Sequence, residues 1–367
     1  MGKADQVLSP DQARSEGAKN LLVNCAGIKP GMKVLFVNES GTPTIDKDTV
    51  TSLENGARAL GADVKSIWAG PVPGPESIPD TIMSAIAASD VSIFNHSLGG
   101  MLRLRPIPDS GLCILNYATT PELLASEWVR VPYDVWKQVA GAVAKELKKA
   151  NTWRIRCPNG TDLSGSVPER ERTVHMNESG LMLHTFPIGT HQPTSATTAT
   201  GTLAIRWLVS SANHDIGDGL RLETPIVAKV EAGRIVDFSG DPKEIGKAKT
   251  YLEEIGRKYG KDPYVINSWH GGTNPLAFVP QRDVAHLNWW QLLSHNNPRT
   301  LHFHVVGDDM PGEFSLPIID PVVEFDGDVV WNRGSFTVLD RPSVQSIVSQ
   351  RPDLANLFKL NSAIGIE

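Results

Sequence analysis

The sequence predicts two domains, an α/β domain with a parallel sheet followed by a β-rich α+β domain. Its length of 367 residues exceeds the usual size of a single domain. Strand and helix patterns alternate across residues 1–132, which is typical of βαβ units and a parallel sheet. From residue 151 the chain is rich in Thr, Ser and Gly with short alternating runs, which favours antiparallel strands. We therefore place the α/β domain at residues 1–132 and the β-rich domain at residues 133–367.

The first domain opens with helical periodicity that stops at Gly27, and a short β-branched run follows from Lys33 to Asn38. The expected elements in chain order are helix 10–26, strand 33–38, helix 46–60, strand 62–68, helix 80–88 and strand 91–95. The loop after the first strand, Glu39 to Thr44, has neither the G-x-G-x-x-G nor the G-x-x-x-x-G-K pattern of nucleotide-binding loops. We expect this domain to be a scaffold.

The second domain begins with an amphipathic helix over residues 133–150, whose last turn carries lysines that suit a helix C-terminus. A turn at Ala232-Gly233 predicts a hairpin, and Asp241-Pro242 opens a helix over residues 243–259. A strand over residues 300–306 follows, and Asp326-Gly327 predicts a closing hairpin.

Composition excludes several classes of protein. Hydrophobic residues make up 40% of the chain and charged residues 21%, so a sizeable core is available. The net charge of -6 and the lack of a basic run argue against nucleic acid as a partner. No apolar run approaches the ~18 residues of a membrane span, and the N-terminus lacks a signal core. Three scattered cysteines indicate no disulfide framework. We expect a soluble, cytoplasmic protein.

Two histidines, His302 and His304, lie in the strand predicted over residues 300–306. Residues i and i+2 of a strand point to the same face, so both imidazoles project together. His270 stands in a glycine-rich segment, and three converging imidazoles can hold a transition metal with open positions. The alternative is that the pair are ordinary polar residues on a solvated face. Asp308, at i+4 from His304, is either a fourth ligand, a partner of the ligands, or part of a turn.

Other histidines fall in the same part of the chain. His184, His191 and His286 lie between residues 184 and 304, so a shared site is possible, and imidazole suits proton transfer near neutral pH. We expect the remaining four to be surface or core residues: His96, His175, His214 and His295. Trp269, Trp289 and Trp290 either wall an aromatic pocket or pack in the core.

Other catalytic patterns are absent from the sequence. There is no G-x-S-x-G nucleophile elbow and no H-E-x-x-H motif. Cys157 precedes a proline at a strand end, and nothing nearby in the sequence would activate it, so we interpret it as an inert thiol.

Six segments between residues 159 and 327 carry a resemblance to a known family. They are Asn159-Gly160-Thr161-Asp162-Leu163, Phe186-Pro187-Ile188-Gly189 with Pro193 and Gly201-Thr202-Leu203-Ala204-Ile205, Gly233 to Gly240, Gly272-Thr273-Asn274-Pro275, His302-Phe303-His304, and Asp326-Gly327. In order and rough spacing they resemble segments of the aminopeptidase T-like metallopeptidases. The resemblance implies an α/β N-terminal domain, a β-rich metal-binding C-terminal domain, and a homo-oligomer.

The chain departs from the family pattern at its metal ligands. Where the peptidases carry two glutamates, this chain has Thr190 (or His191, after a shift of one residue) and Ser268, and His304 replaces the aspartate of their H-x-D motif. Losing these carboxylates removes the bridging anions of a centre with two metals ~3.5–4 Å apart. The family also includes 2,5-dihydroxypyridine 5,6-dioxygenase, which uses a single Fe(II). By that resemblance His302 matches a ligand directly and His270 matches one after a two-residue shift.

The resemblance implies a mononuclear Fe(II) dioxygenase, with metal on His270, His302 and His304. Its expected substrates are O₂ and a hydroxylated aromatic or N-heterocyclic compound, as in aromatic catabolism. His286, which resembles the family's H-x-A segment, and also His191 and His184, are the expected proton-transfer residues. A metal-dependent hydrolase with Zn²⁺ or Mn²⁺, acting on a small amide or cyclic substrate, is the alternative. A non-catalytic binding protein is the third hypothesis.

Overall fold

The computed structural model describes residues 8–41, 45–102, 105–107, 110–169, 182–190, 193–210, 219–277, 287, 290, 294–307 and 314–351. The chain divides into two compact units. The first unit comprises Met1–Lys137 and Met176–Ile188, and the second comprises Gln138–His175 and Gly189–Glu367.

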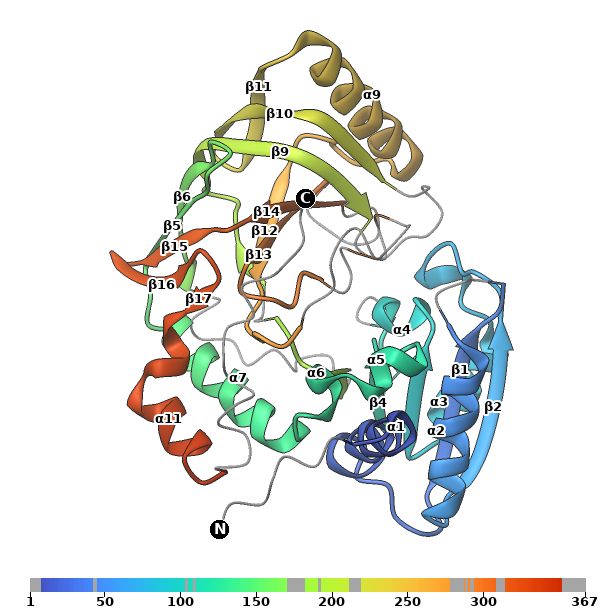
Figure 1. The fold of residues 1–367 in the computed structure, drawn as a ribbon. Helices are drawn as coiled ribbons and strands as arrows, with labels where there is room; N and C mark the ends of the chain where they lie inside the picture. The colour runs from blue at the N-terminus through green and yellow to red at the C-terminus, as the bar shows by residue number, and fades with distance from the viewer. Residues whose placement is uncertain are drawn as a thin grey trace. The chain divides into compact units, whose positions relative to one another are not determined.

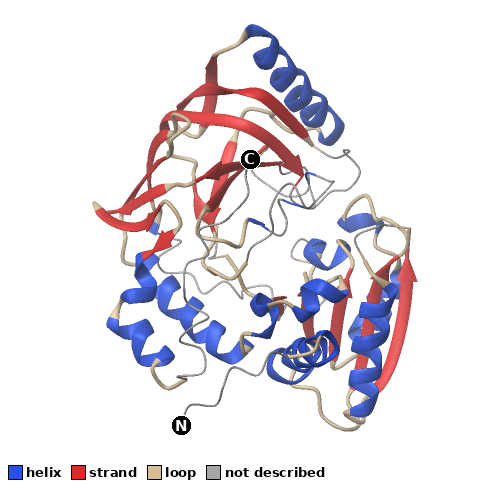
Figure 2. Cartoon of the chain, in the orientation of Figure 1, coloured by secondary structure: helices blue, strands red, loops and turns tan. Residues whose placement is uncertain are grey.

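The first unit contains a parallel sheet with helices beside it (Figure 2). Its strand order is β2-β1-β3-β4-β7, and every neighbouring pair is parallel. The strands are β1 (Lys33–Glu39), β2 (Asp63–Ala69), β3 (Val91–Asn95), β4 (Leu112–Asn116) and β7 (Leu183–Phe186). The helices are α1 (Pro10–Lys19), α2 (Lys47–Ala59), α3 (Asp80–Ala87), α4 (Leu98–Met101), α5 (Pro121–Ala125) and α6 (Glu127–Arg130), with a 3₁₀ turn at Pro75–Ser77. Helix α7 (Tyr133–Leu147) begins in this unit and continues into the second. The parallel sheet predicted from the sequence is confirmed.

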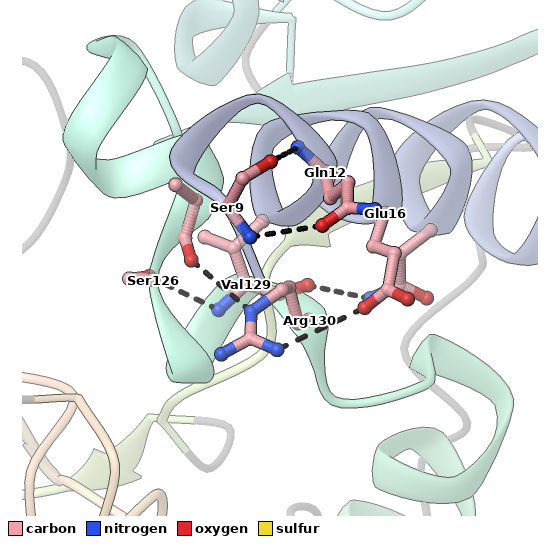
Figure 3. Close-up of polar contacts among 8 residues, drawn as sticks. Ser9, Gln12, Glu16, Ser126, Val129 and Arg130 are labelled. Atoms are coloured by element: carbon pink, nitrogen blue, oxygen red, sulfur yellow. Dashed lines mark hydrogen bonds and ion pairs between the residues drawn. The ribbon is translucent and has the colours of Figure 1, made fainter. Parts of the chain in front are cut away.

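The first helix begins with a reciprocal cap (Figure 3). Ser9 Oγ accepts a hydrogen bond from the Gln12 backbone N–H at 3.3 Å, and the Ser9 N–H donates to Gln12 Oε1 at 2.9 Å. One turn later Glu16 forms an ion pair with Arg130 of α6 at 3.8 Å. The helix predicted over residues 10–26 continues past α1 as a π-helical segment, Asn20–Cys25.

Two strands of this sheet, β4 and β7, were not among the predicted elements. β7 comes from the segment 176–188, inside the part of the sequence that we expected to belong to the second domain. It pairs with β4 from Cys113↔Leu183 to Asn116↔Phe186. A four-residue strand whose partner lies so far away in the sequence gives no local signal, because only the tertiary pairing defines it.

The second unit is mainly a large curled sheet (Figures 1 and 2). Among the described residues its strand order is β17-β16-β15-β5-β6-β9-β14-β13-β12-β8, and β10 pairs with both β9 and β11. The strands are β5 (Thr152–Arg156), β6 (Asp162–Ser166), β8 (Thr194–Ser195), β9 (Thr200–Ser210), β10 (Leu220–Glu231), β11 (Arg234–Ser239), β12 (Ile266–Gly271), β13 (Thr300–Val305), β14 (Phe314–Ile319), β15 (Val322–Phe325), β16 (Asp328–Asn332) and β17 (Ser335–Phe336). The helical elements are α9 (Pro242–Tyr259), which packs along β10, the 3₁₀ turn Thr337–Asp340, and α11 (Pro342–Val348).

Both predicted hairpins are present in this unit. Ala232 and Gly233 have φ of 47° and 73° between β10 and β11, and Asp326 and Gly327 have φ of 49° and 90° between β15 and β16. Two consecutive positive φ values match the twist of the flanking strands, which is why such turns favour glycine. Across the described ranges, no helix has the length and apolar character needed to cross a membrane.

Candidate metal centre

Three histidines converge on one face of the strand pair β12–β13. The strands are antiparallel, and His270 lies directly opposite His302, while His304 is two residues further along β13. The ring nitrogens available as ligands all lie within 4.8 Å of one another. His302 Nε2 and His304 Nε2 are 3.1 Å apart. The same-face geometry that the i, i+2 spacing predicted therefore holds, and the cross-strand register adds the third imidazole.

Both imidazoles on β13 are buried, with 5% of His302 and 8% of His304 exposed. Two nitrogen lone pairs cannot face each other at 3.1 Å without repulsion, so the space between them holds a proton of one ring or a cation. Ring nitrogens bound about 2.1 Å from one ion would be separated by about 3.0–3.4 Å. The spacing of His302 and His304 fits a shared ion.

The opposite face of the same strands is apolar. Trp269 and Phe303, whose side chains alternate with those of the histidines, are fully buried. The Trp269 ring packs against those of Trp153, Phe325 and Trp331 at centroid distances of 5.7, 5.9 and 6.2 Å. This aromatic layer holds the histidine strands in place. Of the two alternatives for Trp269, a core residue or part of a pocket wall, its complete burial supports the core residue.

The ring of His304 is oriented by a short hydrogen-bonded chain. Asn267 Nδ2 donates to the Gly307 carbonyl at 2.7 Å, so Asn267 Oδ1 accepts from Ser268 Oγ at 2.7 Å. The Ser268 hydroxyl therefore donates its only proton to Asn267. At its other contact, His304 Nδ1 at 3.1 Å, it can only accept a hydrogen bond. His304 therefore carries its proton on Nδ1, and its Nε2 lone pair is directed at His302.

The glycine-rich segment after β12 is packed tightly against the loop that precedes β13. A Cβ on Gly272 would lie 2.0 Å from the Asn297 carbonyl oxygen, so only glycine fits there. The Asn274 N–H donates to the Asn296 carbonyl at 3.0 Å, and Thr273 N donates to the Gly189 carbonyl at 2.8 Å. These contacts hold the segments around Gly189 and Gly272 in place beside the histidines.

That packing brings a fourth histidine to the centre. His295, which we expected to be an unrelated surface or core residue, is 9% exposed, and its ring centroid is 5.2 Å from that of His302 in an edge-on arrangement. It is not part of the group of three whose ligand atoms converge. The sequence signal that could have identified His295 is its position seven residues before His302, in the loop leading into β13.

Among the described residues, no carboxylate belongs to this group. A set of three imidazoles with no acidic bridge suits a single transition-metal ion rather than a pair.

Of the remaining predicted residues, His184 and Trp290 are described and four others are outside the described ranges. His184 is in β7 of the first unit, 5.8 Å from the Tyr133 ring, and burial, followed by the nearby Lys137 charge, lowers the pKa of its imidazole. Trp290 packs against Trp207 with ring centroids 5.9 Å apart. His191, His286, Asp308 and Trp289 lie outside the described residues, so their predicted roles stay predictions.

Comparisons of sequence match no family model and no curated protein. Comparisons of structure do find relatives. 2,5-Dihydroxypyridine dioxygenase from Pseudomonas putida KT2440 superimposes with a TM-score of 0.65 and 16% identity, covering 92% of this chain and 99% of that one. AmpT from Thermus thermophilus gives a TM-score of 0.56 and 12% identity, covering 89% of this chain and 100% of that one.

The chain has the fold of these two proteins. The resemblance to the aminopeptidase T-like proteins and to the dioxygenase, which the sequence motifs indicated, is confirmed at the level of fold. One of these relatives is a dioxygenase and the other an aminopeptidase, so an enzyme of either type is compatible with this architecture.

Proposed function

We propose that this protein is a mononuclear non-haem Fe(II) dioxygenase that opens a hydroxylated aromatic or N-heterocyclic ring. The observation that carries the proposal is the convergence of His270, His302 and His304 on one face of β12–β13, with no carboxylate in the group among the residues that the structure describes. Three ligands on one face leave open positions on a metal, as in the 2-His-1-carboxylate sites of non-haem Fe(II) oxygenases, with a third imidazole here in place of the carboxylate. The fold shared with 2,5-dihydroxypyridine dioxygenase supports this reading.

A bound Fe(II) ion would supply a redox-active centre at which substrate and O₂ meet. The chain's own residues prepare the site for it. Three neutral imidazoles leave the ion's +2 charge uncompensated, which favours an anionic, deprotonated hydroxyl group on the substrate. Ser268 and Asn267 hold His304 in the tautomer whose Nε2 is free of a proton and would bind the ion. Burial of His302 and His304 keeps bulk water away from the ligand nitrogens.

A metal-dependent hydrolase that uses Zn²⁺ or Mn²⁺ is the second candidate, because the fold is also that of AmpT. Its substrate would be a small amide or cyclic compound. The three-histidine group argues for one hydrolytic metal rather than two, since the described residues add no bridging carboxylate to it.

O₂ consumption separates the two candidates. The protein is prepared without metal, loaded anaerobically with one equivalent of Fe²⁺, Zn²⁺ or Mn²⁺, and offered 2,5-dihydroxypyridine, other dihydroxylated aromatics and a panel of small amides. We expect O₂ uptake with the iron form and one of the aromatic compounds. Amide hydrolysis by the zinc or manganese form without O₂ uptake would establish the hydrolase instead. His302→Gln, checked for native circular dichroism, should abolish either activity.

A further inference from the structure

The carboxyl ends of the parallel strands in the first unit carry a ladder of buried asparagines. Asn95 Nδ2 donates to Asn38 Oδ1 at 2.8 Å, and Asn116 Nδ2 donates to Asn95 Oδ1 at 2.7 Å. Asn38 Nδ2 in turn donates to Ser66 Oγ at 3.0 Å. These side chains lie on one face of β1, β3 and β4, and each bond satisfies an amide that burial would otherwise leave unpaired. The strand ends are therefore fixed in position.

Glu39, the next residue along β1, points to the other face of the sheet. There it follows Leu35 and Val37, which belong to a buried apolar cluster. The Glu39 side chain is 2% exposed. Its Oε2 accepts a long, 3.4 Å hydrogen bond from the Ser97 N–H, and its Oε1 is buried and has no hydrogen-bond partner in the described part of the chain. A buried carboxylate in this state costs several kcal/mol unless something compensates its charge.

The nearby imidazole does not supply that charge. His96 Nδ1 is 3.9 Å from Glu39 Oε2, but it accepts the Leu98 N–H at 3.0 Å. His96 Nε2 lies 3.0 Å from the Gly70 carbonyl, which can only accept. These two contacts place the proton on Nε2 and leave the ring neutral. In the described part of the chain, no lysine or arginine forms an ion pair with Glu39.

A second buried glutamate shows how this chain compensates such a charge elsewhere. The Glu244 side chain is 3% exposed, as buried as that of Glu39. Lys247 Nζ lies 2.6 Å from its Oε1, and the Glu223 N–H donates to its Oε2 at 2.7 Å. Glu244 thus has a cation on one oxygen and a strong donor on the other. Among the described residues, Glu39 has no such cation.

We propose that Glu39 binds a monovalent cation, either an alkali ion or the ammonium group of a small molecule. One carboxylate beside a neutral imidazole leaves a single negative charge, which one positive charge balances. The strand order β2-β1-β3 reverses direction at β1, and Glu39 and His96 lie at the carboxyl ends of β1 and β3. In open α/β sheets, ligands bind at such a switch point. The site is distinct from the histidine group of the second unit.

Thermal unfolding of the full chain tests the proposal. The melting temperature is measured at constant ionic strength in KCl, NH₄Cl, methylammonium chloride and choline chloride, whose bulky cation cannot enter a buried site. We expect wild type to melt higher in at least one of the first three salts than in choline chloride, with a shift that grows with cation concentration. Glu39→Gln should lose this shift, whereas Glu244→Gln should keep it.

The comparison between salts identifies the source of the charge. A shift with K⁺ assigns the site to a metal ion, and a shift confined to the ammonium salts assigns it to an amine. A wild type that melts identically in all four salts would overturn the proposal. An equal shift in Glu39→Gln would also overturn it, by placing the cation elsewhere. Where K⁺ produces the shift, crystals soaked in thallium(I) give an independent reading, with an anomalous peak expected beside the Glu39 carboxylate.

Discussion

Ser268 Oγ lies 3.1 Å from His304 Nδ1, and the two residues face each other across β12 and β13. The contact sets the tautomer of His304, because the Ser268 proton is already donated to Asn267. We predict that Ser268→Ala lowers metal affinity by about 10–100-fold, as expected for a residue that orients a ligand. Isothermal titration with Fe²⁺ or Zn²⁺ measures the change. Ser239→Ala, which removes an exposed hydroxyl on β11, is the matched control and should bind as wild type does. Equal affinity in both variants would contradict the role given to Ser268.

Packing of the glycine-rich segment against the β13 loop is the second testable feature. Gly272→Ala places a methyl group 2.0 Å from the Asn297 carbonyl oxygen, so the backbone must shift. We expect a loss of about 3 kcal/mol in the free energy of unfolding, measured with urea. Gly246→Ala in α9 has no atom within 4 Å of the added carbon and should be neutral or stabilising by up to about 1 kcal/mol. Similar stability in both variants would show that the segment is loosely packed.

His295 distinguishes a group of three ligands from a group of four. Its ring contacts that of His302, but it is not among the residues whose ligand atoms converge. We predict that His295→Ala still binds one metal per chain, whereas His302→Ala binds none, as measured by inductively coupled plasma mass spectrometry after dialysis. Loss of the metal from both variants would make His295 a ligand and revise the centre.

His184 should contribute a pH dependence to stability. Burial lowers the pKa of its imidazole below the ordinary value of 6.5. Below pH 6.5 the unfolded chain takes up a proton at this residue more readily than the folded chain does. The contribution of neutral His184 to the free energy of unfolding is therefore complete above pH 6.5 and is lost as the pH falls below it. Urea unfolding between pH 5 and 8 should show a flatter pH dependence for His184→Gln than for wild type. An unchanged slope would rule out this assignment.

The fold and part of the site follow from local sequence patterns. The i, i+2 spacing of His302 and His304 on a β-branched strand was enough to place both rings on one face. Likewise the glycines at 233 and 327 marked both hairpins, because positive φ is costly for other residues. Such features need only the backbone period and a turn.

What the sequence could not reveal depends on contacts between distant segments. The register that sets His270 opposite His302 is fixed by pairing of two residues 32 positions apart, and β7 gains its place only through β4. Likewise His295 reaches the centre because Gly272 and Asn274 dock on Asn296 and Asn297. The tautomer of His304 depends on Asn267 and Gly307, which no motif connects.

The central claim is that one metal ion binds to His270, His302 and His304. Crystals of the protein loaded anaerobically with Fe²⁺ test it most directly, through an anomalous difference map at the iron absorption edge. We predict a single peak per chain, about 2.0–2.2 Å from a ring nitrogen of each of the three histidines. Two peaks at this position, or a peak that none of the three rings contacts, would contradict the account.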